Sequence, residues 1–123
     1  MRKTVVVADD EPVVRHLVHA TLALGAPVEV LEARTGAEAL ALVRRRPIDL
    51  LLLDVGMPEL DGLETCRALK ADPATRHIPV VFLSARAQPA DRDAGAAAGA
   101  SGYLTKPFSP RVLSETARRL LGP

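Results

Sequence analysis

The chain has 123 residues, 48% of them hydrophobic and 25% charged, which is the balance of one globular domain rather than of a disordered chain. Its formal net charge of +1 gives no broad electrostatic case for binding nucleic acid or an anionic membrane. No apolar run is long enough to span a bilayer, and the start Met1-Arg2-Lys3 does not read as a signal peptide. The single cysteine, Cys66, excludes an internal disulfide. We therefore expect a cytoplasmic protein.

Segments typical of buried strands alternate with helical segments along the whole chain. The strand-like segments are short and continuously apolar, and they lie at residues 4–8, 28–33, 48–53, 79–83 and 102–105. The helical segments span residues 12–24, 36–46, 61–72, 89–98 and 110–121, and most are flanked by capping residues, proline or glycine. This alternation predicts an α/β fold in which residues 1–123 form a single domain, a doubly wound, five-stranded parallel sheet with five helices and no second domain.

Several helical segments carry more specific expectations. Thr35 and Glu38 have the spacing of a capping box, in which the hydroxyl accepts from the N–H of residue 38 and the glutamate reaches back. The run 44–46 is all arginine; it suits a helix C-terminus, with a nucleic-acid patch as the weaker alternative. The alanine-rich segment 89–98 buries little apolar area, so we expect it to be the least firmly held helix. Cys66 is expected to be a small apolar filler.

The last helical segment has an apolar face. We expect these residues to point toward the core: Val112, Leu113, Ala117, Leu120 and Leu121.

Polar side chains follow four of the strand-like segments. Asp9 and Asp10 follow the first, Asp54 ends the third, Ser84 follows the fourth, and Lys106 follows the fifth. If those strands lie side by side, the residues meet in one crevice at the carboxyl ends of the strands. Clustered carboxylates need a cation, and oxygen ligands suit Mg²⁺. A lysine and a hydroxyl suit a phosphoryl group, and a carboxylate can form an acyl phosphate. These residues therefore predict a metal-assisted phosphoryl acceptor at Asp54.

Each of these residues taken alone has a plainer interpretation. Asp54 has the position of a turn residue, and the acids of 9–11 suit the start of a helix. Ser84 alone reads as a local cap, and Lys106 alone as a solvated side chain. The joint arrangement, with one kind of group at each strand end, is what favours a site.

Four segments together resemble a known family. The acidic pair lies in Val5-Val6-Val7-Ala8-Asp9-Asp10-Glu11-Pro12, and Leu52-Leu53-Asp54-Val55-Gly56-Met57-Pro58 is followed by Asp61-Gly62. The other two segments are Val81-Phe82-Leu83-Ser84-Ala85 and the stretch 99–108, which contains Lys106-Pro107-Phe108. This combination resembles the receiver domain of two-component response regulators, similar to chemotaxis regulators. The resemblance implies a flavodoxin-like sheet with strand order 2-1-3-4-5.

The resemblance also implies roles at the strand ends. Asp54 would accept a phosphoryl group from a sensor histidine kinase, a phosphotransfer protein or a small acyl phosphate. Asp10, Asp54 and the main-chain carbonyl of Gly56 would hold Mg²⁺, with Asp9 acting through water. Lys106 would pair with the phosphoryl oxygens. The domain would be a signalling switch that catalyses only its own phosphorylation and dephosphorylation.

The switch would be read out through two further residues. Ser84 would turn inward toward the phosphoryl group, and Tyr103 would follow into the vacated space. The fourth helix, fifth strand and fifth helix would then contact a downstream output protein, or an output domain absent from this chain, without direct nucleic-acid or membrane binding by this domain. The resemblance further implies a cis Lys106–Pro107 peptide bond.

Two positions depart from common versions of the pattern. Gly56, two residues after the acceptor, lacks a side chain, so we expect an open mouth and fast exchange of the phosphoryl group. Arg86, two residues after Ser84, either stabilises an incoming anion or is only solvated, and solvation is slightly favoured.

Three other functions compete with the receiver hypothesis. A haloacid-dehalogenase-type phosphatase would need a second Asp where this chain has Gly56. A flavodoxin-type cofactor binder would need a phosphate-cradling loop where the chain has the acidic residues 9–11. A phosphorylation-independent interaction adaptor on the same fold is the alternative that the sequence leaves open.

Overall fold

The computed structural model describes residues 2–25, 27–57, 61–86 and 88–122. Strands and helices alternate as expected, and the order along the chain is β1 (Lys3–Ala8), α1 (Pro12–Ala23), β2 (Val28–Ala33), α2 (Gly36–Arg45), β3 (Leu50–Asp54), α3 (Gly62–Ala71), β4 (Val80–Ser84), α4 (Pro89–Ala97), β5 (Gly102–Thr105) and α5 (Pro110–Leu121). None of the helices in these ranges is long and apolar enough to cross a membrane.

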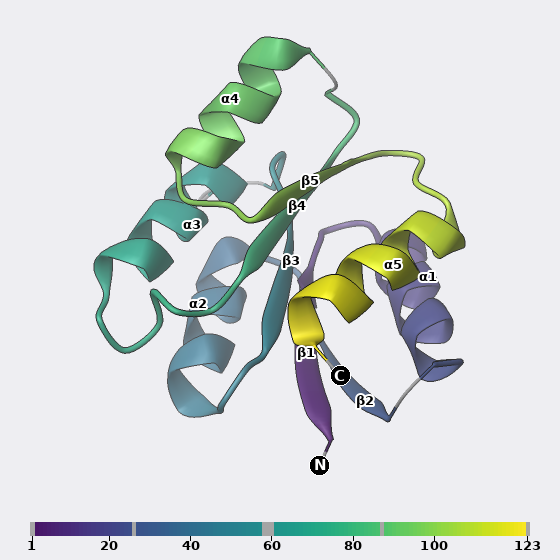
Figure 1. The fold of residues 1–123 in the computed structure, drawn as a ribbon. Coiled ribbons are helices and arrows are strands. Elements are labelled where there is room, and N and C mark those ends of the chain that lie inside the picture. Colours follow the sequence, from purple (N-terminus) through teal and green to yellow (C-terminus); the bar gives the residue numbers. More distant parts are fainter. Residues whose placement is uncertain (1, 26, 58–60, 87, 123) are drawn as a thin grey trace.

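The five strands form one parallel sheet in the order β2-β1-β3-β4-β5, which confirms the expected flavodoxin-like topology. Helices α1 and α5 cover one face of the sheet, and α2, α3 and α4 cover the other (Figure 1). Parallel neighbours require crossover connections, and the helices supply them. Because β3 is the middle strand, its carboxyl end lies between those of β1 and β4.

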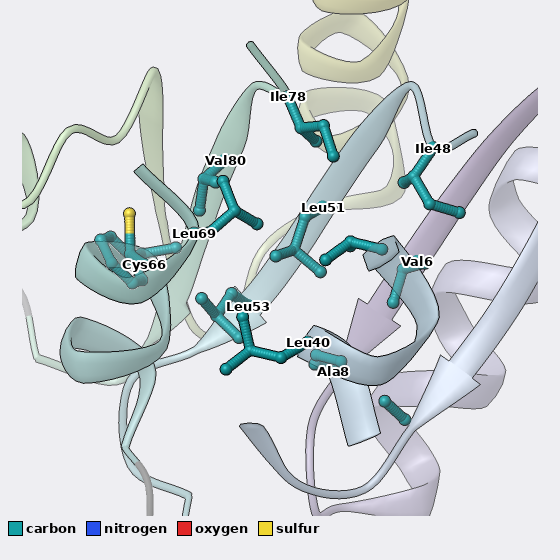
Figure 2. Packing of buried hydrophobic residues seen from close by; sticks show 14 of the residues in the cluster. Val6, Ala8, Leu40, Ile48, Leu51, Leu53, Cys66, Leu69, Ile78 and Val80 are labelled. Atoms are coloured by element: carbon teal, nitrogen blue, oxygen red, sulfur yellow. The ribbon is translucent and has the colours of Figure 1, made fainter. Parts of the chain in front are cut away.

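The continuous apolar runs are explained by burial on both faces of the sheet. In β3, Leu51 and Leu53 pack toward α2 and α3, while Leu50 and Leu52 pack toward α1 and α5, and all four are fully buried. Figure 2 shows the cluster beneath α2 and α3, in which Cys66 lies among aliphatic side chains. The expected filler role of Cys66 is therefore confirmed. Burying each leucine stabilises the fold by about 1.5–3 kcal/mol.

Two expectations about packing were wrong. The third strand begins at Leu50 rather than at residue 48; just before it, the Asp49 side chain accepts a hydrogen bond from the N–H of Thr4 at 2.8 Å, in the place of a main-chain carbonyl. On α5, Leu113 and Ala117 are buried, but Val112 is 43% exposed and lies outside the core. Its position one residue before Leu113 places it on the outer flank of the helix.

The helix ends follow the expected chemistry with one difference. The Thr35 hydroxyl accepts from the N–H of Glu38 at 3.1 Å, whereas the Glu38 carboxylate accepts from the N–H of Arg34 rather than from that of Thr35. Arg46 at the end of α2 pairs with Glu29 at 2.6 Å, so this arginine has a structural partner within the domain.

Candidate functional site

Strand β1 delivers two carboxylates in different environments. Asp9 is fully buried, and its Oδ1 atom accepts a hydrogen bond from the N–H of Glu11 at 2.9 Å. Asp10 is exposed. The Asp9 main chain continues the sheet beyond β1, because its N–H donates to the carbonyl of Ala33 at 3.0 Å. The buried carboxylate is thus fixed, while the exposed one faces incoming groups.

Asp54 is the last residue of β3 and meets both of these acids. It is 7% exposed, and its Oδ1 accepts from the N–H of Gly56 at 3.3 Å. One carboxylate oxygen from each of Asp9, Asp10 and Asp54 lies within 4.8 Å of the others. The topology brings them together, since β1 and β3 are adjacent and both end at the same edge of the sheet.

Lys106 enters the same cluster from the end of β5. Its Nζ atom lies 2.7 Å from Asp9, 3.2 Å from Glu11 and 3.4 Å from Asp54. The Lys106 main chain is held by its own N–H, which donates to the carbonyl of Ser84 at 2.7 Å. The following Lys106–Pro107 peptide bond is cis, as expected. The Lys106 ammonium is therefore shared by the carboxylates of Asp9, Glu11 and Asp54.

The crowding of like charges changes the proton affinities of the site. Burial, and then the charge of Asp9, raise the pKa of Asp54 above its ordinary value, although Lys106 acts in the opposite direction. Burial lowers the pKa of Lys106, but the hydrogen bond to Asp9 and the charges of Asp54 and Asp9 outweigh it, so that this pKa is raised overall. Lys106 thus stays protonated, and the site carries an excess of negative charge that a further cation would neutralise.

Ser84 and Tyr103 are linked through one main-chain residue. The Ser84 Oγ atom accepts from the N–H of Arg86 at 3.0 Å, and the carbonyl of Arg86 accepts from the Tyr103 hydroxyl at 2.8 Å. Ser84 is buried and Tyr103 half-buried, whereas Arg86 is exposed. The favoured expectation of a solvated Arg86 side chain agrees with that exposure.

The sequence matches the model of the response regulator receiver domain over residues 5–118. The chain belongs to the response regulator receiver family. Receiver domains are signalling switches of two-component systems that interact with histidine kinases and output domains, so the family matches the expectation from the sequence motifs.

Individual relatives agree with that assignment. The chain is 38% identical over 119 residues to the phosphate regulon transcriptional regulatory protein PhoB of Pseudomonas aeruginosa, covering 97% of this chain and 52% of PhoB. Its structure is similar to that of the chemotaxis protein CheY4 of Vibrio cholerae, with a TM-score of 0.91, 34% identity and coverage of 98% and 100%. It is also similar to the Mn(2+)-bound form of response regulator Rcp1, with a TM-score of 0.85, 25% identity and coverage of 97% and 94%.

The receiver domain spans about half or less of the length of the curated relatives it matches. Output functions named in those longer proteins therefore belong to them. PhoB is named a transcriptional regulatory protein, and the expectation that this domain itself does not contact nucleic acid stays a prediction.

The structure brings the sequence-predicted residues together at one edge of the sheet. The oxygens of Asp9, Asp10 and Asp54 cluster with the Lys106 ammonium, and Ser84 ends the strand next to Asp54. Gly56 is exposed, and among the described residues, which leave out 58–60, no atom lies within 4 Å of where a Cβ would be; the open mouth and fast exchange stay predictions. Pro58, in the expected loop motif, lies outside the described residues.

Two residues near the site were not anticipated. Glu11 reaches Lys106, although as the residue before α1 it was expected only to favour the helix dipole. Arg15, one turn later, donates to the main-chain carbonyl of Asp9 at 2.7 Å and pairs with Glu32 at 2.9 Å. The four-residue spacing of Glu11 and Arg15 places both on the same side of α1, which was the one available sign that they share a neighbourhood.

A cavity of about 270 Å³ lies away from these carboxylates. It is lined by the C-terminal ends of α1 and α5 and by the start of β2, including Leu22, Val28 and Leu121. It opens at the amino-terminal edge of the sheet, so it is separate from the crevice that contains Asp54.

Proposed function

We propose that this receiver domain accepts a phosphoryl group on Asp54 and uses it to switch the α4–β5–α5 surface. The observation that carries the proposal is the position of Asp54, whose carboxylate lies with Asp9 and Asp10 on one side and the Lys106 ammonium on the other. A carboxylate with only a structural role does not require so many charged neighbours. A carboxylate that accepts a charged group needs neighbouring charges to stabilise that group.

The chemistry follows from this geometry. A carboxylate oxygen of Asp54 attacks the phosphorus of a phosphohistidine or a small acyl phosphate, and a P–O bond to Asp54 forms as the P–N or P–O bond to the donor breaks. The electron pair of the broken bond leaves with the donor. The Lys106 ammonium, 3.4 Å from Asp54, is placed to bind a phosphoryl oxygen and offset its charge. Hydrolysis of the acyl phosphate returns the carboxylate.

The donor set also fits a divalent cation. Asp10, Asp54 and the main-chain carbonyl of Gly56 are the proposed ligands, with Asp9 assisting through water. Three carboxylates with oxygens within 4.8 Å offer the hard oxygen ligands that Mg²⁺ prefers. The similar protein Rcp1 is described in an Mn(2+)-bound form, which supports a divalent ion here. Such an ion would supply charge neutralisation at the developing phosphoryl group.

Ser84 and Tyr103 are the proposed reporters of phosphorylation. Ser84 Oγ now accepts a hydrogen bond from the N–H of Arg86, and its own hydroxyl proton is available to a phosphoryl oxygen. Turning Ser84 inward changes the Arg86 main chain, to which Tyr103 is bonded at 2.8 Å. The proposed partners are a sensor histidine kinase or phosphotransfer protein upstream and an output protein or domain downstream, in the cytoplasm.

The proposal is tested by incubating the protein with Mg²⁺ and acetyl phosphate and measuring the intact mass, with beryllofluoride binding as a second readout. The expected result is one added phosphoryl group that requires Mg²⁺ and is absent in Asp54→Asn. Uptake that survives in Asp54→Asn overturns the assignment of the acceptor. If neither reagent binds, the protein is a phosphorylation-independent adaptor on the same fold.

A further inference from the structure

One arginine of α4 contacts Tyr103 with its side chain. The Arg92 guanidinium lies over the tyrosine ring, with its Cζ atom 5.1 Å from the ring centroid. The Nη2 atom of the same guanidinium donates to Oγ1 of Thr105, two residues further along β5, at 2.9 Å. Arg92 therefore contacts both Tyr103 and Thr105, which lie on the same face of β5. Its planar guanidinium can stack on a ring and donate hydrogen bonds at the same time.

The backbone of α4 approaches the same ring closely. A Cβ on Gly95 would lie 3.3 Å from Cδ2 of Tyr103 and 3.0 Å from Cδ2 of Phe82. Phe82 and Tyr103 pack in a tilted arrangement, with ring centroids 6.3 Å apart. Glycine at this position lets the helix rest on both rings, and Gly95 is the buried residue of α4. The sheet side of this helix thus depends on the position of Tyr103.

The remaining side chains give α4 few other means of attachment. Its sequence, PADRDAGAA, has no apolar side chain larger than proline or alanine. A helix with so little buried area is held by specific contacts rather than by a broad apolar face. Because Arg92 is the long side chain that reaches from α4 to β5, it is the residue able to pass a change in Tyr103 on to the helix.

We infer that Arg92 is a positioning residue that couples the state of Tyr103 to α4. This inference rests on the proposed function and adds the step after Tyr103. The connected contacts run from Ser84 Oγ to the Arg86 main chain, from there to the Tyr103 hydroxyl, and from the Tyr103 ring to Arg92. When Tyr103 moves, the guanidinium loses its stacking partner, and α4 is released from β5. The state of the phosphoryl site is thereby read on α4.

The test uses the fact that the chain has one tyrosine and no tryptophan. Tyrosine labelled with ¹³C in the ring gives signals from Tyr103 alone, while amide hydrogen exchange reports on α4. Both are recorded in Mg²⁺ with and without beryllofluoride, for the wild type, Arg92→Gln and Arg92→Lys. Glutamine and arginine have similar helix propensities, so the substitution leaves the intrinsic stability of α4 nearly unchanged.

Arg111→Gln is the matched control. Arg111 is an exposed arginine on α5 that pairs with Glu115 at 3.0 Å, so its substitution makes the same chemical change away from Tyr103. In the wild type and in this control, beryllofluoride is expected to alter both the Tyr103 signals and the exchange of α4. In Arg92→Gln, the change in α4 exchange is expected to fall by about two- to fivefold, as for loss of an exposed cation–π contact. Arg92→Lys keeps the charge but not the planar fork, and should resemble Arg92→Gln.

The possible failures are distinguishable. If beryllofluoride fails to bind the wild type, the proposed function itself is overturned. If beryllofluoride binds and Arg92→Gln shows the same α4 response as Arg111→Gln, the coupling through Arg92 is overturned while the phosphoryl acceptor stands. If Arg92→Lys retains the full response, the positive charge rather than the stacked guanidinium is sufficient, and the assigned contact is wrong.

Discussion

Gly62 lies directly behind the phosphoacceptor strand, and its replacement by alanine tests how closely α3 packs there. It is the first residue of α3, and its N–H donates to the carbonyl of Val55 at 3.1 Å. A Cβ at this position would collide with the main-chain oxygen of Asp54 and would lie 2.8 Å from Cα of Val55. These are main-chain atoms, so they cannot rotate away as a flexible side chain would.

The expected cost of Gly62→Ala follows from these contacts. Overpacking costs about 1–3 kcal/mol, and contacts with rigid main chain belong at the upper end of that range. The gain in helix propensity from glycine to alanine offsets up to about 1 kcal/mol. The net loss in the free energy of unfolding is therefore about 2 kcal/mol, or roughly 6–10 °C in Tm for a domain of this size. Because Asp54 and Val55 must shift, Mg²⁺ binding should weaken as well.

Gly56→Ala is the control within the same connection between β3 and α3. No atom of the residues that the structure describes (58–60 are not among them) lies within 4 Å of its Cβ position, so alanine should be neutral or stabilise the fold by up to about 1 kcal/mol. Urea unfolding followed by circular dichroism measures both variants, with equal m-values required for the comparison. Equal free energies of unfolding for Gly62→Ala and Gly56→Ala would refute the reasoning, because the two sites would then be equally open.

Three further predictions concern the charges and access of the site. Glu11→Gln should raise the rate of phosphorylation by acetyl phosphate about two- to fivefold at low salt, because it removes one carboxylate from Lys106. The control Glu115→Gln should leave the rate unchanged. A gain that persists at high salt would contradict an electrostatic cause. Gly56→Asn should slow dephosphorylation by covering the open mouth, so an unchanged phosphoryl lifetime would count against water entering there. Asp54→Asn should increase the free energy of unfolding at neutral pH without metal. The pKa of the Asp54 carboxyl is raised in the native state, so between its unfolded and native pKa values the native state binds more protons than the unfolded state. The free energy of unfolding of the wild type therefore falls as pH rises through that window. Urea unfolding across pH should show this slope in the wild type, and an identical slope in Asp54→Asn would exclude the carboxyl as its source.

The strands and the acidic crevice were predictable because both follow from one-dimensional patterns. The unbroken apolar run of β3 indicated burial on both faces, and Leu51 and Leu52 indeed pack into opposite clusters. The rule that parallel strands end at one edge of the sheet then placed Asp10, Asp54 and Lys106 together without any knowledge of distances.

Individual side-chain contacts that follow from no strand-end rule were not predictable. Asp49 looked like part of a strand, but it precedes β3, and both its side chain and its N–H are bonded to the Thr4 main chain. Val112 fits an apolar face by type, but burial depends on how α5 is rotated against α1, which local periodicity defines only within a residue or so. The contact of Arg92 with Tyr103 joins α4 to β5, and no spacing rule connects an exposed arginine to a tyrosine in the next strand.

Lys106 connects the charge chemistry of the site to its mechanical response. The Asp9 carboxylate is held in place, because it is fully buried and its other oxygen accepts a hydrogen bond from the N–H of Glu11. The Asp9 contact at 2.7 Å is shorter and buried, whereas the Glu11 contact at 3.2 Å is exposed, so we expect a phosphoryl group at Asp54 to weaken the Glu11 contact first. The Lys106 N–H donates to the carbonyl of Ser84 at 2.7 Å, so we expect a shift of the Lys106 main chain to be felt at the last residue of β4. The proposed acceptor chemistry and the proposed Ser84 switch are thus joined by this main-chain hydrogen bond as well as by the contact proposed between Ser84 and the phosphoryl group.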